Sequence, residues 1–330
     1  MRPLNKFINK LFAKKKAENE KKEMKETMIR TFRLGYVALK VHDVMKVSEH
    51  YENTLGLTLV EEGDQGERYL STGMDHHNII LTKSTESELD AVGWQIAETD
   101  SLQNIAKYLK EQGFDAEIKT DAQPGIKELI ELTDPSGHTV HLFQKIEMPG
   151  PGYKLDKVAP FKLGHLALGS LNKEKAVAFY KEILGFHETD KIGEKATFLT
   201  CNRDHHTLNV SNFGYKMLHH IAFELKDASH HTVACDVLHA HKVPVVWGPF
   251  RHTAGHNIAS YHHDPELNLI ELYTEMDQYI ADLGIFEPRP YHEELPLRPR
   301  VWDGNCTWYP KVEYDIIDSV MKKVEKYMKK

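Results

Sequence analysis

The sequence predicts an α+β fold in which one β-α-β-β-β unit occurs twice in tandem. Two observations indicate this. The segment LGYVALKVHDVMKVSEHYENTLGL, which begins at Leu34, matches LGHLALGSLNKEKAVAFYKEILGF, which begins at Leu163, at an offset of 129 residues (163 − 34). The two halves also end alike, with ELIELTDPSGHTVHLF over 128–143 and ASYHHDPELNLIELYT over 259–274. An internal match of this length indicates that a whole structural unit is duplicated.

Each half follows the same order of elements. An alternating apolar strand comes first, an amphipathic helix follows it, and a glycine ends the helix, Gly56 in the first half and Gly185 in the second. Further helices are predicted near 101–113 and 228–241. Each half then closes on two strands that are joined by an Asp-Pro turn.

The composition is that of a soluble globular protein. Hydrophobic residues make up 41% and charged residues 28% of the 330 residues, and no apolar run approaches the ~20 residues of a membrane span. The net charge of −7 argues against a nucleic-acid partner. Three cysteines without CxxC spacing (Cys201, Cys235 and Cys306) predict neither a disulfide framework nor a zinc–thiolate site, and favour a cytoplasmic location.

Residues 1–30 differ from the rest of the chain because they are rich in lysine, with a few apolar residues at roughly helical spacing. A helix lying on a membrane surface is one interpretation. We favour the other, a solvated extension that is partly helical or disordered, because the apolar residues cover only two helical turns.

The duplication also serves as an internal comparison, since residues needed only for folding should persist in both halves. Three positions carry a potential metal ligand in the second half alone: His165 matches Tyr36, His220 matches Trp94, and Glu271 matches His141. Two imidazoles and a carboxylate form the facial triad typical of non-haem Fe(II), which leaves three coordination positions open. The second half is therefore predicted to hold the metal. These ligands do not discriminate Fe(II) from Mn(II).

A longer motif begins at Gly248 and reads GPFRHTAGHNIASYHHDPELNLIELY. It resembles the signature of the type I extradiol ring-cleavage dioxygenases, such as catechol 2,3-dioxygenase, in the vicinal oxygen chelate superfamily. The matching residues are Gly248, His252, His256, Tyr261, Asp264, Pro265 and Glu271. The resemblance covers roughly residues 31–280. It implies that the paired βαβββ modules curl into two open barrels around a metal.

The resemblance also implies roles for individual side chains. The residues at the places of His252 and Tyr261 contact the substrate oxygens in the family. A further catalytic histidine precedes the second ligand, His220. The interval of 15 residues (220 − 205) favours His205 for this role, and the adjacent His206 is the alternative.

Other side chains are expected to support the site from behind, with His219, His256 and Arg251 as the candidates. His219 neighbours a ligand along a strand and therefore points to the opposite face. The homoprotocatechuate branch gathers arginines and an asparagine near the substrate carboxylate. Here Ala167 stands two residues after the first ligand, so we do not expect a charged group on the substrate.

The implied activity is the extradiol cleavage by O2 of catechol, or of an alkyl-substituted catechol, to a 2-hydroxymuconate semialdehyde. One alternative is an extradiol enzyme for a larger or charged catechol, such as 2,3-dihydroxybiphenyl or homoprotocatechuate. Another is a metal-free protein of the same fold that binds or sequesters a small molecule. A glyoxalase-like isomerase is disfavoured, because it would draw ligands from both halves. The family is commonly tetrameric, so a homo-oligomer is expected.

The chain is accordingly predicted to divide into four parts: a lysine-rich extension over 1–30, an N-terminal non-catalytic barrel over 31–150, a C-terminal metal-binding catalytic barrel over 151–282, and a tail over 283–330. Prolines and aromatic residues in 285–310 predict irregular structure, which either packs on the barrel, covers its mouth as a lid or forms an interface arm. A terminal amphipathic helix is predicted over 313–327.

Overall fold

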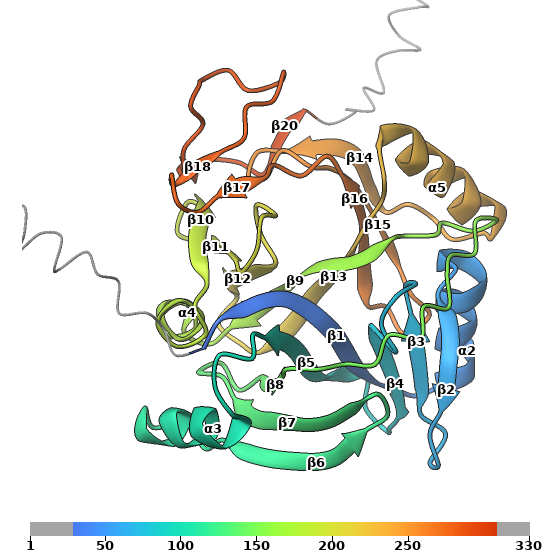
Figure 1. Cartoon of the computed structure of the whole chain (residues 1–330). Helices are drawn as coiled ribbons and strands as arrows, with labels where there is room; N and C mark the ends of the chain where they lie inside the picture. Colours follow the sequence, from blue (N-terminus) through green and yellow to red (C-terminus); the bar gives the residue numbers. More distant parts are fainter. Residues whose placement is uncertain (1–28, 309–330) are drawn as a thin grey trace, which may run out of the picture.

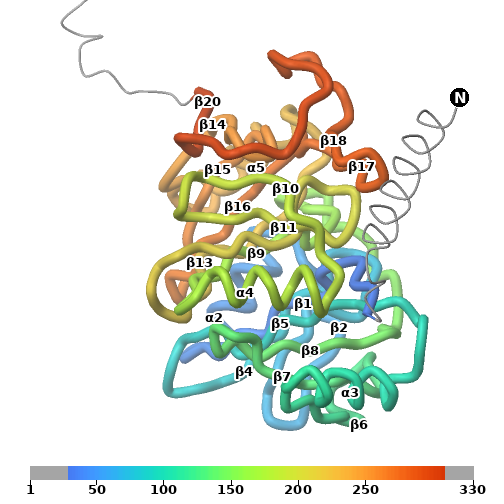
Figure 2. Tube along the Cα trace, turned by 90° about the vertical axis from the view of Figure 1, so that its left-hand side faces the viewer, coloured from blue at the N-terminus to red at the C-terminus, as the bar shows by residue number. Residues whose placement is uncertain are grey.

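The computed structural model describes residues 29–308. Two curled sheets dominate it, the N-terminal one below and the C-terminal one above in Figure 1. Figure 2 shows the same stacking from the side. Residues 1–28 and the predicted helix over 313–327 lie outside the described residues. In the part that is described, no helix is both long and apolar enough to cross a membrane.

The first module forms a mixed eight-stranded sheet in the order β2-β3-β4-β1-β5-β8-β7-β6. Its elements are β1 (Thr31–Val41), α2 (Val44–Glu49), the π-helical segment η1 (His50–Leu55), β2 (Thr58–Glu62), β3 (Arg68–Ser71), β4 (Ile79–Lys83), β5 (Glu88–Ile96), α3 (Leu102–Glu111), β6 (Glu117–Gln123), β7 (Ile126–Thr133) and β8 (Thr139–Phe143). Strand β1 pairs in parallel with β4 and antiparallel with β5.

The second module repeats this order in a ten-stranded sheet, β19-β10-β11-β12-β9-β13-β16-β15-β14-β20. Its elements are β9 (Lys162–Ser170), α4 (Lys173–Ala178), the π-helical segment η2 (Phe179–Ile183), β10 (His187–Ile192), β11 (Ala196–Thr200), β12 (Leu208–Asn212), β13 (Met217–Glu224), α5 (Ala228–Ala240), β14 (Trp247–His252), β15 (Ile258–His263) and β16 (Leu269–Thr274). The predicted tandem fold is therefore confirmed.

The tail contains more regular structure than its prolines predict. It holds four short strands, β17 (Tyr279–Ile280), β18 (Ile285–Phe286), β19 (Val301–Trp302) and β20 (Cys306–Trp308). Strand β19 pairs with β10 at one edge of the second sheet, and β20 pairs with β14 at the other. The tail thus runs from one edge of this curled sheet to the opposite edge (Figure 1).

The helices begin and end where the sequence repeat places their signals. Asp43 and Asn172, which are 129 residues apart (172 − 43), each accept a hydrogen bond from the backbone N–H three residues on, at the starts of α2 and α4. Gly56 and Gly185 follow the two helical segments with φ of 85° and 76°. Only glycine adopts this left-handed conformation readily, so it stops both helices at the same point.

Strand register shows which residues of the two modules correspond. Tyr36 on β1 lies opposite Gly93 on β5, and His165 on β9 lies opposite Ala222 on β13. The same offset of 129 residues therefore relates all four residues. In the first module Tyr36 Oη lies 2.6 Å from Nδ1 of His141, so these two side chains hold each other where the second module has His165 and Glu271.

The prediction that Trp94 matches His220 is wrong. The register pairs His220 with Ala91, and Trp94 with Phe223, because β-bulges shift the pairing along these strands. Trp94 and Phe223 are both fully buried in the core. The asymmetry between the halves remains, since alanine offers no ligand atom where the second module has His220.

The core is shared between the modules, because each packs its helical segment against the sheet of the other. Tyr180 of the second module contacts Trp94 of the first edge-on, with ring centroids 6.3 Å apart. Tyr51 of the first module contacts Phe223 of the second in the same way. All four rings are fully buried. Separating the modules would expose them, at about 2 kcal/mol or more for each ring.

Buried histidines are expected to make the fold sensitive to acid. Burial lowers the pKa of His50, at the contact between the modules, to about 4. The unfolded chain takes up this proton near pH 6.5, so the stabilisation is complete above that pH. It is lost as the pH falls from 6.5 to about 4, by up to about 3 kcal/mol for this group.

Urea unfolding of the iron-free protein at several pH values between 7.5 and 4.5 measures this loss. His50→Phe removes the titrating group and keeps a ring against His262, so its free energy of unfolding should fall less steeply over this range. Equal slopes for the wild type and the variant would contradict the prediction.

Candidate metal centre

Three adjacent strands carry His165, His220 and Glu271, which lie on β9, β13 and β16. Ala222 on β13 is the register partner of both His165 and Glu271. His220 lies two residues before Ala222 and therefore shares its face of the sheet. The three side chains consequently project from one wall of the barrel, and the small Ala222 leaves the space between them open.

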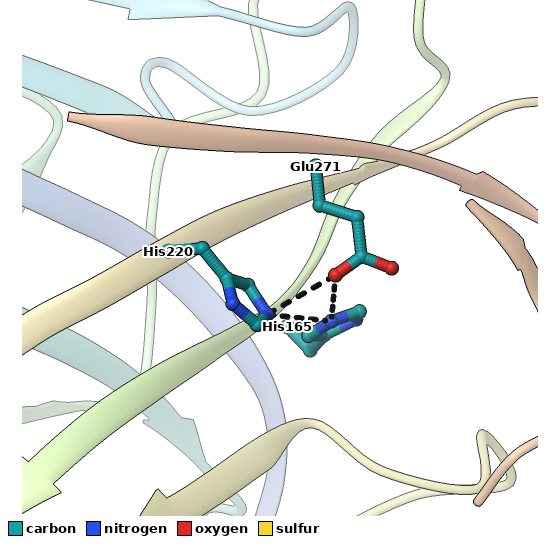
Figure 3. A group of neighbouring side chains, drawn as sticks. All are labelled: His165, His220 and Glu271. Atoms are coloured by element: carbon teal, nitrogen blue, oxygen red, sulfur yellow. Dashed lines mark hydrogen bonds and ion pairs between the residues drawn. The ribbon is translucent and has the colours of Figure 1, made fainter. Parts of the chain in front are cut away.

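The ligand atoms of these residues converge on one point, as Figure 3 shows. Glu271 Oε2 lies 3.2 Å from His165 Nε2 and 3.1 Å from His220 Nε2, and the two Nε2 atoms are 3.4 Å apart. All three side chains are buried. Two imidazole nitrogens 3.4 Å apart gain little from each other, but donors about 2.1 Å from a shared ion stand roughly 3.0–3.4 Å apart. The arrangement therefore fits a metal.

The electrostatics agree with metal binding. Burial lowers the pKa of His165, so this imidazole is neutral and its lone pair is available. Burial alone would raise the pKa of Glu271, but the adjacent His165 and His220 hold it well below its usual range. A buried carboxylate between neutral imidazoles needs a cation, which a metal supplies.

The neighbouring histidine pair occupies two different environments. The ring of His206 lies against His165, with centroids 4.3 Å apart. The ring of His205 instead stacks on Phe286, and its Nε2 lies 3.0 Å from Oδ2 of Asp190. The sequence interval favoured His205 as the catalytic histidine, whereas this geometry favours His206 for a role beside the metal.

His252 and Tyr261 face the metal ligands from neighbouring strands. Tyr261 Oη donates a hydrogen bond to Glu271 Oε2 at 2.8 Å and lies 2.9 Å from His252 Nε2. Burial and the nearby Glu271 carboxylate raise the pKa of Tyr261 well above its usual range, so the phenol keeps its proton. The other nitrogen of His252, Nδ1, lies 2.8 Å from the backbone oxygen of Asn305 in the tail. The tail therefore orients His252.

The supporting residues lie around the centre in different ways. His219 Nδ1 lies 2.7 Å from Nδ1 of His220, and the His219 ring stacks on Phe213. The guanidinium of Arg251 donates to the backbone oxygen of His256 and to Glu275, so its charge is already paired.

A second cluster brings together His256, Asp277 and His292. His256 Nδ1 and His292 Nε2 lie 2.8 and 2.9 Å from different oxygens of the Asp277 carboxylate. The backbone N–H of Arg289 donates to Nδ1 of His292, so Nε2 carries the proton and cannot bind a metal. We interpret this cluster as a hydrogen-bonded anchor of the tail.

Two contributors to the site escaped sequence reasoning. Asn257 donates to Glu271 Oε1 at 2.9 Å and so fixes the carboxylate from its far side. Its place in the spacer of the motif, directly after His256, was a signal that could have drawn attention to it. Asn305 acts through its backbone oxygen, for which side-chain patterns carry no signal.

Comparison with known proteins agrees with this fold and site. The profile of the Glyoxalase/Bleomycin resistance protein/Dioxygenase superfamily matches residues 33–142 and 162–272. The metapyrocatechase of Pseudomonas sp. strain CF600 is 24% identical over 76% of this chain and 88% of its own. The biphenyl-2,3-diol 1,2-dioxygenase of Paraburkholderia xenovorans strain LB400 is 28% identical over 70% of this chain and 84% of its own.

The fold has a solved counterpart in the 2,3-dioxygenase LapB from Pseudomonas sp. KL28. That structure matches with a TM-score of 0.73 and 22% identity, over 84% of this chain and 99% of the other. The chain belongs to the glyoxalase/bleomycin resistance protein/dioxygenase superfamily, because the profile covers both modules. The predicted resemblance to extradiol dioxygenases and the predicted assignment to the oxidoreductases are confirmed.

Proposed function

We propose that the protein cleaves an uncharged catechol by extradiol insertion of O2 at an Fe(II) ion held by His165, His220 and Glu271. The convergence of these three buried ligand atoms within 3.4 Å of one another is the observation that carries the proposal. The names of the relatives support it, since they include a metapyrocatechase and a biphenyl-2,3-diol dioxygenase. Mn(II) suits the same ligands.

Bound at this site, the metal would chelate both catechol oxygens, ease the loss of their protons and bring O2 to an open position. The chain supplies orientation and proton handling. Tyr261 keeps its proton and can donate a hydrogen bond to a substrate oxygen. Burial lowers the pKa of His206 well below its usual range, so the imidazole is neutral and can accept a proton from the substrate.

The arginines near the centre support an uncharged substrate. Arg251 is engaged by Glu275 and by the backbone of its own strand region, and its guanidinium lies over the Tyr291 ring. Arg300 is engaged by Glu294 and lies over Trp302. A carboxylate on the substrate would therefore lack a free cation. Catechol, alkyl catechols and 2,3-dihydroxybiphenyl are the preferred candidates.

The experiment loads the protein anaerobically with Fe(II), adds one catechol, admits air and follows the yellow ring-fission product. We expect kcat/KM for the best neutral catechol to exceed that for homoprotocatechuate by on the order of 100-fold, because the carboxylate would be buried unpaired. Iron-free protein is the control, and Mn(II)-loaded protein tests the choice of metal. An absence of colour across catechol, 3- and 4-methylcatechol, 2,3-dihydroxybiphenyl and homoprotocatechuate would refute the proposal in favour of a binding protein.

A further inference from the structure

Asp190 is a buried carboxylate that joins the tail to the barrel. It lies on β10, where 3% of its surface is exposed. The backbone N–H of Arg300 donates to Oδ1 at 2.8 Å, and the indole Nε1–H of Trp302 donates to Oδ2 at 2.7 Å. Both donors belong to the tail segment that pairs with β10. The tail therefore holds this carboxylate in one orientation.

The same carboxylate determines which nitrogen of His205 carries the proton. Oδ2 of Asp190 lies 3.0 Å from His205 Nε2, and the His205 ring is fully buried. An imidazole lone pair at this distance would be repelled by a carboxylate oxygen, so Nε2 is the protonated nitrogen. In a neutral imidazole the other nitrogen, Nδ1, is then an acceptor.

His205 passes this constraint to His206. The Nδ1 atoms of the two rings lie 2.9 Å apart, a distance at which one of them must donate. Because His205 Nδ1 is the acceptor, His206 Nδ1 carries the hydrogen. Nε2 of His206 is consequently left as an acceptor, on a ring that packs against the metal ligand His165.

We propose that Asp190 is a positioning residue: through His205 it fixes the tautomer of His206 in which Nε2 accepts a proton. This inference rests on the proposed function, in which His206 handles the substrate proton. It assigns His205 to holding a neighbour and gives the tail a chemical task. A carboxylate that sets a histidine tautomer is worth up to about 10⁴ in kcat in the serine proteases.

The first test uses Asp190→Asn, whose amide places an N–H near one of the present donors and removes the preference of His205 for Nε2–H. We expect kcat to fall about 100-fold with KM and iron content little changed. His205→Phe keeps a ring on Phe286 and should show the same fall if Asp190→Asn fails to fold. The matched control is Glu188→Gln on the same strand, which pairs only with Lys181 and Lys191 among the described residues and should match the wild type.

A double-mutant cycle separates positioning from general loosening of the structure. If Asp190 acts through His206, adding Asp190→Asn to His206→Ala should cause no further fall in kcat. A multiplied loss in the double variant, or a kcat of Asp190→Asn within about twofold of the wild type, would overturn the inference.

A second readout needs no turnover. In ¹⁵N-histidine spectra of the iron-free protein we expect His206 as the Nδ1–H tautomer and His205 as the Nε2–H tautomer, with His205 changed in Asp190→Asn. A spectrum that shows His206 as Nε2–H would overturn the inference. Wild-type protein that cleaves no catechol would refute the proposed function alone, because these spectra still decide the tautomer.

Discussion

The His220→Ala variant is expected to lose its iron and, with it, ring cleavage. The substitution removes one of only two imidazoles in the triad, and Glu271 would be left buried with a single partner of this kind. Loss of a residue that merely orients a ligand typically costs 10–100-fold in metal affinity, roughly, so loss of the ligand itself should cost more. Metal analysis after gel filtration, together with the colour assay, measures both effects.

His219→Ala is the matched control for this experiment. It removes the adjacent imidazole of the same strand, which contacts His220 at Nδ1 but offers no atom to the triad. We expect it to retain iron, with affinity lowered by no more than about 100-fold. If His219→Ala lost the metal while His220→Ala kept it, the register of β13 would be shifted by one residue.

His206→Ala is expected to lower kcat by about 10²- to 10⁴-fold while iron remains bound, because the variant loses the imidazole that handles the substrate proton. The ring of His206 packs on a ligand without supplying a ligand atom to the triad. Steady-state kinetics with the best neutral catechol, together with metal analysis, gives both quantities.

The comparison with His205→Phe distinguishes the two histidines. We expect His206→Ala to be the more damaging of the two, because His205 acts only through its neighbour in our proposal. If His205→Phe were instead the slower enzyme, the assignment of the catalytic role to His205 from the sequence interval would be the better one.

Much of the fold was predictable because the duplication repeats strong local signals. The capping residues Asp43 and Asn172, and the glycines Gly56 and Gly185, determine helix ends by short-range chemistry that a sequence displays directly. The ligand trio was predictable for a related reason. Residues that differ between two copies of one strand are visible without any structure.

The errors arose where long-range geometry decides. Trp94 was matched with His220 because β-bulges, which shift pairing by a residue, leave no mark in an apolar strand. The choice between His205 and His206 depends on how a loop spends one residue, which an interval cannot show. The contributions of Asp190 and of the Asn305 backbone depend on a tail that crosses the whole second module.

The crossing of the tail has a consequence for how copies of this chain can associate. The second sheet ends on β19 and β20, strands of two and three residues that occupy both of its borders. Such short terminal strands are poor templates for strand addition by another polypeptide. Among the described residues, the first sheet ends on the longer β2 and β6. Any self-association by strand addition should therefore use the N-terminal half and leave the metal-binding half untouched.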